Sequence, residues 1–352
     1  MKPQYKNILI DAVMHLGDLI HAITLIPLLK QAYPNAEISY LVKPELVQLF
    51  NNVDNVKYVI PYQYKSKGDY FSVFKMAKEI KKYDFDLSIS LDPRLRLSAM
   101  MWLAGIPTRV GSESLFGWKA GPERFFFSDY FRLKDYDIKK HSAAENFQYL
   151  VKLFTGNSNV LFIKPKFNMP LEKNIDYVKK ELSDIPVSSK KVAMCVNTKD
   201  PIRNWPVEKF AELIDQIVES YNACIIITGM EEDQNVAQQV INLVRNKNFV
   251  INFCGKTNLE QLSAFFYYVD FLVHFDNGMG HFAAAAGCPT ITLFSNSDPT
   301  QFQPLHEAGL TVGGACECIK TCNKKLRETC ALKCLNDISV EMVMEKVDLM
   351  IK

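Results

Sequence analysis

The chain has 352 residues, of which 48% are hydrophobic and 23% charged, so it suits a globular protein of two domains and is not of the disordered class. The formal net charge of +2 gives no indication of a nucleic-acid partner. No apolar run reaches the roughly 18 residues of a membrane span. The first residues lack the apolar stretch and small-residue cleavage site of a secretory signal, so we expect a cytoplasmic protein.

Buried-strand patterns alternate with amphipathic stretches through the first half of the chain, which predicts a parallel sheet with helices on both faces. Pro27 is expected to kink or restart the first helix. Residues 112–136 interrupt the alternation and read as a functional loop or an insertion. The predicted strands are 7–13, 37–42, 56–60 and 87–91, and the predicted helices are 19–33, 70–82, 95–104 and 141–154.

The alternation restarts after residues 158–170, which we interpret as the crossing between domains. Thr257 and Glu260 fit a capping box, and Ser339 is the expected N-cap of the last helix. The sequence therefore predicts two doubly wound α/β halves with a cleft between them. The predicted strands are 191–197, 224–228, 249–253, 269–275 and 291–294, and the predicted helices are 207–221, 231–245, 257–268, 281–286 and 339–351.

The most informative stretch is residues 274–299, which read as strand, glycine turn, short helix and strand. Asp276, Asn277, Gly278, Met279 and Gly280 form the expected turn, whose glycines permit close approach of a ligand. A helix beginning at His281 would direct its first amides at that turn, which suits a diphosphate. The alternative is a strand–helix–strand corner that binds nothing. His274 is interpreted as a core histidine.

Asp18 follows the first predicted strand, and ligands of such sheets bind at the carboxyl ends of the strands. A carboxylate there suits a general base for group transfer. Taken alone, Asp18 reads more simply as the N-cap of a helix that begins at Leu19.

Three motifs together resemble the bacterial heptosyltransferases of glycosyltransferase family 9. They are the segment HLGDLIHAITLIPLLKQAYPNAEISYLV at residues 15–42, the element Arg203-Asn204-Trp205-Pro206, and the signature at residues 276–299. The resemblance spans nearly the whole chain. It implies a GT-B fold and inverting transfer of heptose from ADP-heptose to the lipopolysaccharide core, with no cofactor required for catalysis. It also implies an acceptor domain at 1–165, a nucleotide-sugar domain at 166–338 and a C-terminal helix at 339–352.

The resemblance assigns roles to residues. Asp18 would deprotonate the acceptor hydroxyl, and Arg203 would take the place of a phosphate-binding lysine. Glu232 is preferred over Glu231 as the acid that holds the donor ribose or base, although either glutamate also suits a first helical turn. The departing diphosphate would be held by the main-chain amides around Asp276, Asn277, Gly278, Met279, Gly280 and His281.

Acceptor contacts are expected from cations near strand ends, chiefly Arg94, Arg96 and Lys119, with Arg109 and Arg124 as further candidates. Each of them also reads as an ordinary surface charge. Residues 115–131 mix aromatic and basic side chains and suit contact with the inner membrane, where a lipid-linked acceptor lies, although loop packing explains them nearly as well.

Five cysteines cluster near the end of the chain, and four thiolates at short spacing can hold zinc or iron. Their spacing does not form a pair of CxxC knuckles, so a structural zinc or iron site and reduced thiols both stay open. The five are Cys316, Cys318, Cys322, Cys330 and Cys334.

The sequence leaves three alternatives open. Gly278, Gly280 and Ala283 fit the dinucleotide pattern G-x-G-x-x-A, which would suit a nicotinamide oxidoreductase, although that pattern normally opens a domain. A non-catalytic nucleotide-sugar-binding protein could share the fold. Within the transferase class, the acceptor could be a protein, such as an autotransporter, in place of lipopolysaccharide.

Overall fold

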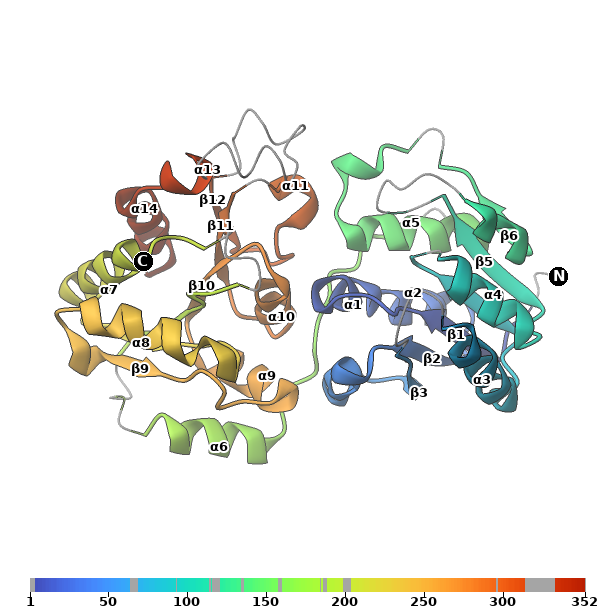
Figure 1. The fold of residues 1–352 in the computed structure, drawn as a ribbon, viewed down its shortest axis with the longest axis horizontal. Coiled ribbons are helices and arrows are strands. Elements are labelled where there is room, and N and C mark those ends of the chain that lie inside the picture. Colours follow the sequence, from blue (N-terminus) through green and yellow to red (C-terminus); the bar gives the residue numbers. More distant parts are fainter. Residues whose placement is uncertain are drawn as a thin grey trace. The chain divides into compact units, whose positions relative to one another are not determined.

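The computed structural model describes residues 4–63, 69–92, 94–113, 115, 121–133, 136–157, 160–183, 185, 189–198, 204–295, 297–313 and 333–351. The chain divides into two compact units, Met1–Pro165 and Lys166–Lys352, and each contains a parallel sheet of six strands (Figure 1). The predicted α/β class with two doubly wound sheets is therefore confirmed. Within the described ranges, no helix is both long and apolar enough to cross a membrane.

The first unit has the strand order β3-β2-β1-β4-β5-β6. Its strands are β1 (Asn7–Asp11), β2 (Glu37–Val42), β3 (Val56–Pro61), β4 (Leu87–Ser90), β5 (Thr108–Ser112) and β6 (Asp129–Phe131). Its α-helices are α1 (Leu16–Ala22), α2 (Leu25–Ala32), α3 (Tyr70–Ile80), α4 (Leu95–Leu103) and α5 (Ala143–Thr155). Its 3-10 turns are η1 (Pro44–Asn52), η2 (Lys81–Tyr83), η3 (Pro122–Phe126) and η4 (Ile138–Lys140).

Helices cover both faces of this sheet. α3 and α4 pack together on one face, where apolar side chains of β1, β2, α3 and α4 form one buried cluster. α1, α2 and α5 pack together on the other (Figure 1). Pro27 lies in the first turn of α2, where its missing N–H costs no hydrogen bond, so the predicted restart of the helix is confirmed.

The second unit has the strand order β12-β11-β10-β7-β8-β9. Its strands are β7 (Lys191–Met194), β8 (Cys224–Ile227), β9 (Val250–Asn252), β10 (Phe271–Phe275), β11 (Thr290–Phe294) and β12 (Leu310–Gly313). Its α-helices are α6 (Glu172–Glu181), α7 (Val207–Tyr221), α8 (Gln234–Leu243), α9 (Leu259–Tyr268), α10 (Gly278–Ala285), α11 (Pro299–Phe302), α13 (Lys333–Asn336) and α14 (Val340–Ile351). Its 3-10 turns are η6 (Glu231–Asp233) and η7 (Lys247–Phe249).

The central strand β10 lies between β7 and β11, and all five of its residues are buried. α7, α8 and α14 pack on one face of the sheet, and α9 and α10 belong to the other layer. The Ser339 hydroxyl accepts a hydrogen bond from the Met342 amide at 3.3 Å, so the predicted N-cap of the last helix is confirmed.

Two predicted helix starts are wrong by a few residues. α9 is capped by Asn258, whose side chain accepts from the Gln261 amide at 2.9 Å, and the reciprocal partner is Gln261 in place of Glu260. α10 begins at Gly278, three residues before the predicted start at His281. In both helices an asparagine is the N-cap, Asn258 in α9 and Asn277 in α10. The sequence pattern had favoured Thr257 as the cap of the first helix and His281 as the start of the second.

Candidate functional site

In the first unit, the candidate site lies at the carboxyl ends of β1 and β4. These strands are parallel neighbours, and Asp11 pairs with Ser90 at their ends. α1 begins at Leu16 with His15 as N-cap, and Asp18 is the third residue of the helix. Its carboxylate accepts a hydrogen bond from the His15 backbone. The N-cap interpretation of Asp18 is therefore wrong, because the helix starts two residues before it.

The protein environment brings Asp18 toward the range of a base that works near neutral pH. Burial, with a smaller contribution from the charge of Asp92, raises the pKa of Asp18 from 3.8 to about 6. Lys43 and Arg94 act in the opposite direction but do not cancel the effect. A carboxylate with this pKa is ionised at pH 7 and still has useful proton affinity.

Two further carboxylates lie at the same edge, and sequence reasoning did not single them out. Asp11 is 2% exposed and accepts from the Ser90 hydroxyl at 3.1 Å, and burial together with Asp92 raises its pKa to about 7. Asp92 is held by Arg94, whose Nε and Nη2 lie 2.7 and 2.6 Å from the same carboxylate oxygen. The signal that could have found both is the one that found Asp18, an acid at or just after the end of a buried strand.

The other predicted acceptor cations differ in their surroundings. Arg96 is half-buried in the first turn of α4. Arg109 donates to the carbonyl oxygens of Phe126 at 2.6 Å and Pro107 at 3.0 Å, so this guanidinium has a structural role. Lys119 lies outside the described residues.

In the second unit, the predicted donor residues lie together where β10 gives way to α10. Asp276 and Asn277 connect the two elements, and Gly278 and Met279 begin the helix. The Asn277 side chain caps it by accepting from the Met279 amide at 3.0 Å. The first amides of a helix point beyond its N-terminus and favour an anion. The N-terminus of α10, at the carboxyl end of β10, is therefore suited to bind a diphosphate.

Gly280 is needed for packing inside the unit. A Cβ atom at this position would lie 1.8 Å from Cε1 of His274. His274 is fully buried, its Nε2 lies 2.9 Å from the Thr292 hydroxyl, and burial lowers its pKa to about 3, so the core-histidine interpretation is confirmed. His281 is also buried, with a pKa lowered by burial to about 4. Its ring is neutral at pH 7 and supplies no positive charge for a phosphate.

A hydrogen-bonded network joins the loops that follow β7 and β8. The Asn204 amide donates to Asn197 Oδ1 at 2.6 Å, and its oxygen accepts from the Thr198 backbone at 2.8 Å. Asn197 in turn donates to Asp233 at 2.7 Å. Glu232 is exposed beside Asp233 in η6 and remains accessible to a ligand.

Trp205, the residue after Asn204, is buried and fixes this part of the chain. Its indole is 1% exposed and donates to the Ile338 carbonyl at 3.1 Å. Lys209 donates to the same carbonyl at 2.7 Å and lies over the indole ring. Arg203 itself lies outside the described residues.

The predicted metal cluster cannot be assembled from the described residues, because four of its cysteines, Cys316, Cys318, Cys322 and Cys330, lie outside them. Cys334 is half-buried in α13. Among the residues that the structure does describe, no group of three or more His, Cys, Asp or Glu side chains is arranged to hold a metal ion.

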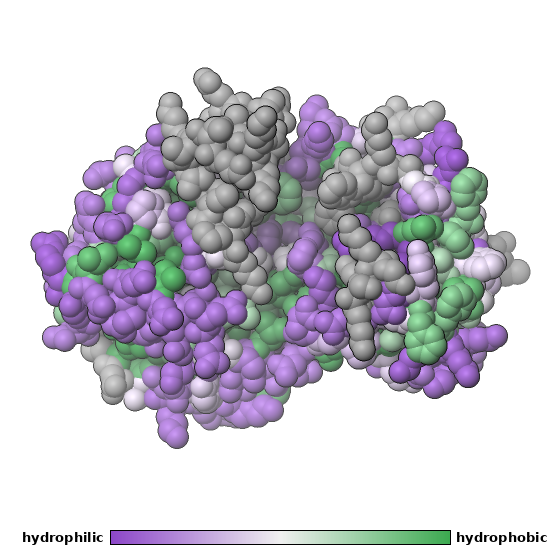
Figure 2. All heavy atoms as spheres, in the orientation of Figure 1, coloured by the Kyte–Doolittle hydropathy of each residue, from purple (hydrophilic) through white to green (hydrophobic). Residues whose placement is uncertain are grey.

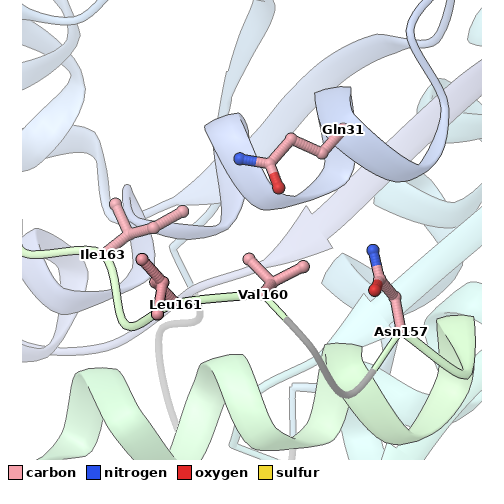
Figure 3. Close-up of a pocket in the computed structure, with 5 residues that line it drawn as sticks. All are labelled: Gln31, Asn157, Val160, Leu161 and Ile163. Atoms are coloured by element: carbon pink, nitrogen blue, oxygen red, sulfur yellow. The ribbon is translucent and has the colours of Figure 1, made fainter.

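An open pocket of about 420 Å³ in the first unit lies away from these residues (Figure 3). It is lined by Gln31 near the end of α2 and by Asn157, Val160, Leu161 and Ile163 after α5. The end of α2 leads into the start of β2, so the pocket belongs to the amino edge of the sheet. Ligands of parallel sheets bind at the opposite edge, where Asp18 lies.

Comparison with known proteins agrees with this fold. The chain is 24% identical to a lipopolysaccharide core heptosyltransferase of Haemophilus influenzae over 85% of this chain and 82% of that protein. A glycosyl transferase of family 9 from Veillonella parvula has the same fold, with a TM-score of 0.85 and 23% identity over 99% of this chain and 98% of that one. The Escherichia coli ADP-heptose lipopolysaccharide heptosyltransferase II follows, with a TM-score of 0.78 and 19% identity over 98% of both chains.

The fold is therefore GT-B, and the chain is a glycosyltransferase. The oxidoreductase interpretation is wrong, because the chain matches a glycosyltransferase family. The G-x-G-x-x-A pattern lies in α10, after β10 and not after the first strand of its unit, and its second glycine makes room for His274. The interpretation as a non-catalytic nucleotide-sugar-binding protein is wrong as well, because the matching family is one of glycosyltransferases. The model of glycosyltransferase family 9 (heptosyltransferase) matches residues 73–335, and the chain belongs to that family.

Proposed function

We propose that this protein transfers heptose from ADP-heptose to a sugar of the lipopolysaccharide core with inversion at the anomeric carbon. In this proposal the first unit binds the acceptor and the second binds the donor. The names of the similar proteins favour this donor and this acceptor. The observation that carries the mechanism is Asp18, an acid at the carboxyl edge of the first sheet whose pKa is raised to about 6.

The reaction needs one base and one stabilised leaving group. The acceptor oxygen attacks the anomeric carbon as its proton passes to Asp18, and the bond from that carbon to the diphosphate oxygen breaks. ADP departs with the electron pair of that bond. Attack from the side opposite the diphosphate gives the inverted product. A positioned base of this kind contributes roughly 10²–10⁴-fold to the rate.

We propose that the donor lies at the start of α10. The backbone from Asp276 to His281 would hold the diphosphate, with help from Arg203, and Glu232 would hold the ribose or the base. What supports this is the capped helix start at the edge of the sheet and the exposure of Glu232. The mechanism requires an acceptor hydroxyl at Asp18 to reach the anomeric carbon of a donor bound there.

The acceptor is the less constrained part of the proposal. A protein acceptor is the alternative within the same chemistry, and a lipid-linked core would bring the protein to the cytoplasmic surface of the inner membrane. Arg94, Arg96 and Lys119 remain proposed contacts for acidic groups of the acceptor, with Arg94 also engaged with Asp92.

The decisive experiment offers the purified protein ADP-heptose with truncated lipopolysaccharide cores and, separately, with candidate acceptor proteins. Mass spectrometry should show one heptose added to the core, and NMR should show the anomeric configuration inverted. Transfer of heptose only to protein would show that the acceptor is a protein and not the lipopolysaccharide core. A product with retained anomeric configuration would exclude a single displacement in which Asp18 is the base.

For the cysteine segment we propose a structural zinc or iron site that takes no part in the transfer. Metal analysis of the purified protein should find about one equivalent of zinc or iron, because four of the five thiolates suffice for one tetrahedral site. Substitution of Cys316 and Cys318 by serine should remove the metal. Protein free of both metals as purified would leave these residues as reduced thiols.

A further inference from the structure

A continuous series of hydrogen bonds, the edge network, crosses the carboxyl edge of the second sheet. It begins at the Thr198 backbone amide, which donates to Asn204 Oδ1 at 2.8 Å, and the Asn204 side chain donates onward to Asn197 Oδ1 at 2.6 Å. Asn197 Nδ2 then donates to Asp233 Oδ1 at 2.7 Å. The series ends where the Met230 backbone amide donates to Asp233 Oδ2 at 2.7 Å.

The direction of every bond in the edge network is fixed by its two ends. A backbone amide can only donate, so Asn204 must present its oxygen to Thr198 and its NH2 group to Asn197. Asn197 must therefore direct its own NH2 group at Asp233, which also receives the Met230 amide. A residue that receives two donors needs two acceptor atoms. A carboxylate supplies both, whereas an asparagine at position 233 would leave one donor unpaired.

The edge network joins the segments that carry the two proposed side-chain contacts of the donor. Asn204 directly follows Arg203 in the sequence, and Asp233 directly follows Glu232 in η6. η6 leads into α8, which packs in the core of the unit and presents hydrophilic side chains to solvent (Figure 2). The network therefore ties η6, at the start of a firmly packed helix, to the loop before α7.

The Asp233 carboxylate also lies against the backbone at the end of β8. A Cβ atom at Gly229 would lie 2.6 Å from Asp233 Oδ2, so glycine makes room for the carboxylate there. The Gly255 amide donates to the Gly229 carbonyl at 3.0 Å and joins the same backbone to the loop after β9. The position of the carboxylate is thus set by its two donors and by the backbone beside it.

A branch of the edge network reaches the start of α10. The Cys195 thiol donates to the Asn197 carbonyl at 3.4 Å and accepts from Asn277 Nδ2 at 3.7 Å. Burial raises the pKa of Cys195 to about 11, so the thiol keeps the proton that it donates. The oxygen of the same Asn277 side chain caps α10 by accepting from the Met279 amide at 3.0 Å. The turn proposed to hold the diphosphate is therefore tied to the same network.

We propose that Asn197 and Asp233 are positioning residues that hold the donor site in its binding geometry before the nucleotide sugar arrives. They act through Arg203, Glu232 and the turn before α10, and they make no contact with the donor themselves. The inference rests on the proposed function, because it takes the donor contacts to lie on these three segments. It adds the residues that set the spacing of those segments. A site assembled in advance avoids the free-energy cost of ordering loops on binding.

The test measures ADP affinity by calorimetry in the wild type and three variants. Asp233→Asn leaves one donor unpaired, and Asn197→Asp sets two carboxylates against each other, so each should weaken ADP binding roughly tenfold. The exchanged variant Asn197→Asp/Asp233→Asn restores every bond. The carboxylate at position 197 accepts from both neighbouring side chains, and the oxygen at position 233 still accepts from Met230. This variant should bind ADP within about threefold of the wild type, a large departure from additivity.

Asp215→Asn is the matched control. Asp215 also accepts from two backbone amides, those of Arg245 and Asn246, but it does so where α8 ends, at the amino edge of the sheet. Its substitution should lower the urea midpoint of unfolding, as Asp233→Asn does, and leave ADP affinity unchanged. The control therefore separates a loss of stability from a loss of donor-site geometry.

Asp233→Asn protein that binds ADP as tightly as the wild type would overturn the inference. An exchanged variant that binds ADP no better than the two single variants would overturn it as well. Either result, together with heptose transfer by the wild type, would leave the proposed function standing. The expected pattern of ADP affinities in a protein that transfers no heptose would instead count against the proposed function alone.

Discussion

The carboxylate of Asp92 influences those of Asp11 and Asp18 at the edge of the first sheet. Burial is the main reason that Asp11 and Asp18 hold their protons more tightly than usual, and the negative charge of Asp92 is the second. Arg94 offsets part of that charge because it binds Asp92 directly. The proton affinity of Asp18 is therefore set in part by charged neighbours that follow β2 and β4 or cap α4, and each of them can be changed separately.

The first prediction concerns the pH profile of transfer. The base works when ionised, so kcat/KM should fall as the pH drops through about 6. Asp92→Asn removes a negative neighbour and should move this fall to lower pH. Lys43→Met removes a positive neighbour and should move it to higher pH. Rate profiles of the three proteins check this, and shifts in the same direction for both variants would contradict the electrostatic account.

The second prediction concerns stability. The pKa of Asp11 is about 7 in the folded protein and 3.8 in the unfolded reference, so the folded state binds the proton more tightly. Its contribution to stability is therefore full at low pH and is lost as the pH rises from about 4 to about 7. Asp11→Asn cannot ionise and keeps an oxygen for the Ser90 hydroxyl. It should be at least about 1 kcal/mol more stable than the wild type at pH 8.

Urea unfolding at pH 5 and pH 8 measures this difference. The advantage of the asparagine variant should be smaller at pH 5 than at pH 8, because the loss begins near pH 4 and is complete only near pH 7. Ser90→Ala serves as a control for the hydrogen bond alone. If Asp11→Asn were less stable than the wild type by the same amount at pH 5 and pH 8, ionisation of Asp11 would not destabilise the folded protein, which would contradict the prediction.

Of the acids at the edge of the first sheet, the sequence predicted Asp18 and missed Asp11 and Asp92, for a physical reason. Asp18 was found because it follows the first predicted strand and also lies within a family motif. Asp11 and Asp92 form their environment only when β1 and β4 pair, which brings together residues about 80 positions apart. The contact of Arg109 with Phe126 and that of Asn197 with Asp233 also join residues from separate elements, 17 and 36 positions apart.

Among the elements, α10 depends on a close fit between Gly280 and the buried ring of His274. Gly280→Ala should destabilise the second unit by about 1–3 kcal/mol, because the added Cβ would overlap the ring. His274→Ala opens space and should make the same glycine substitution nearly neutral. Denaturant midpoints of the four proteins complete a double-mutant cycle. Additive losses would mean that the two side chains do not compete for the same space.

The elements that the sequence missed are short or polar. β6 and β12 have three and four residues, too few for a period-two pattern to stand out. α6 buries only Asn174 and Val178, so its apolar face is narrow. The strong predictions, β1, β10 and α7 among them, are elements with long buried runs or a wide apolar face. The sheet order itself could be inferred only from the rules of α/β folds.

In the proposed reaction of the whole molecule, the first compact unit binds the acceptor and the second binds the donor. ADP should therefore slow hydrogen exchange in the second unit, at residues 276–281 and around η6, and leave β1 and α1 of the first unit nearly unchanged. Exchange measured by mass spectrometry with and without ADP checks this. Protection centred on the first unit would contradict the assignment of the donor to α10.

The most direct test of the central claim is Asp18→Asn, which keeps the size of the side chain and removes its basicity. ADP affinity should stay within about threefold, because the proposed donor contacts lie in the other unit, whereas kcat should fall by roughly 10²–10⁴. Both quantities can be measured on the same preparation, by calorimetry and by release of ADP. A variant that binds ADP and turns over at the rate of the wild type would show that Asp18 is not the base.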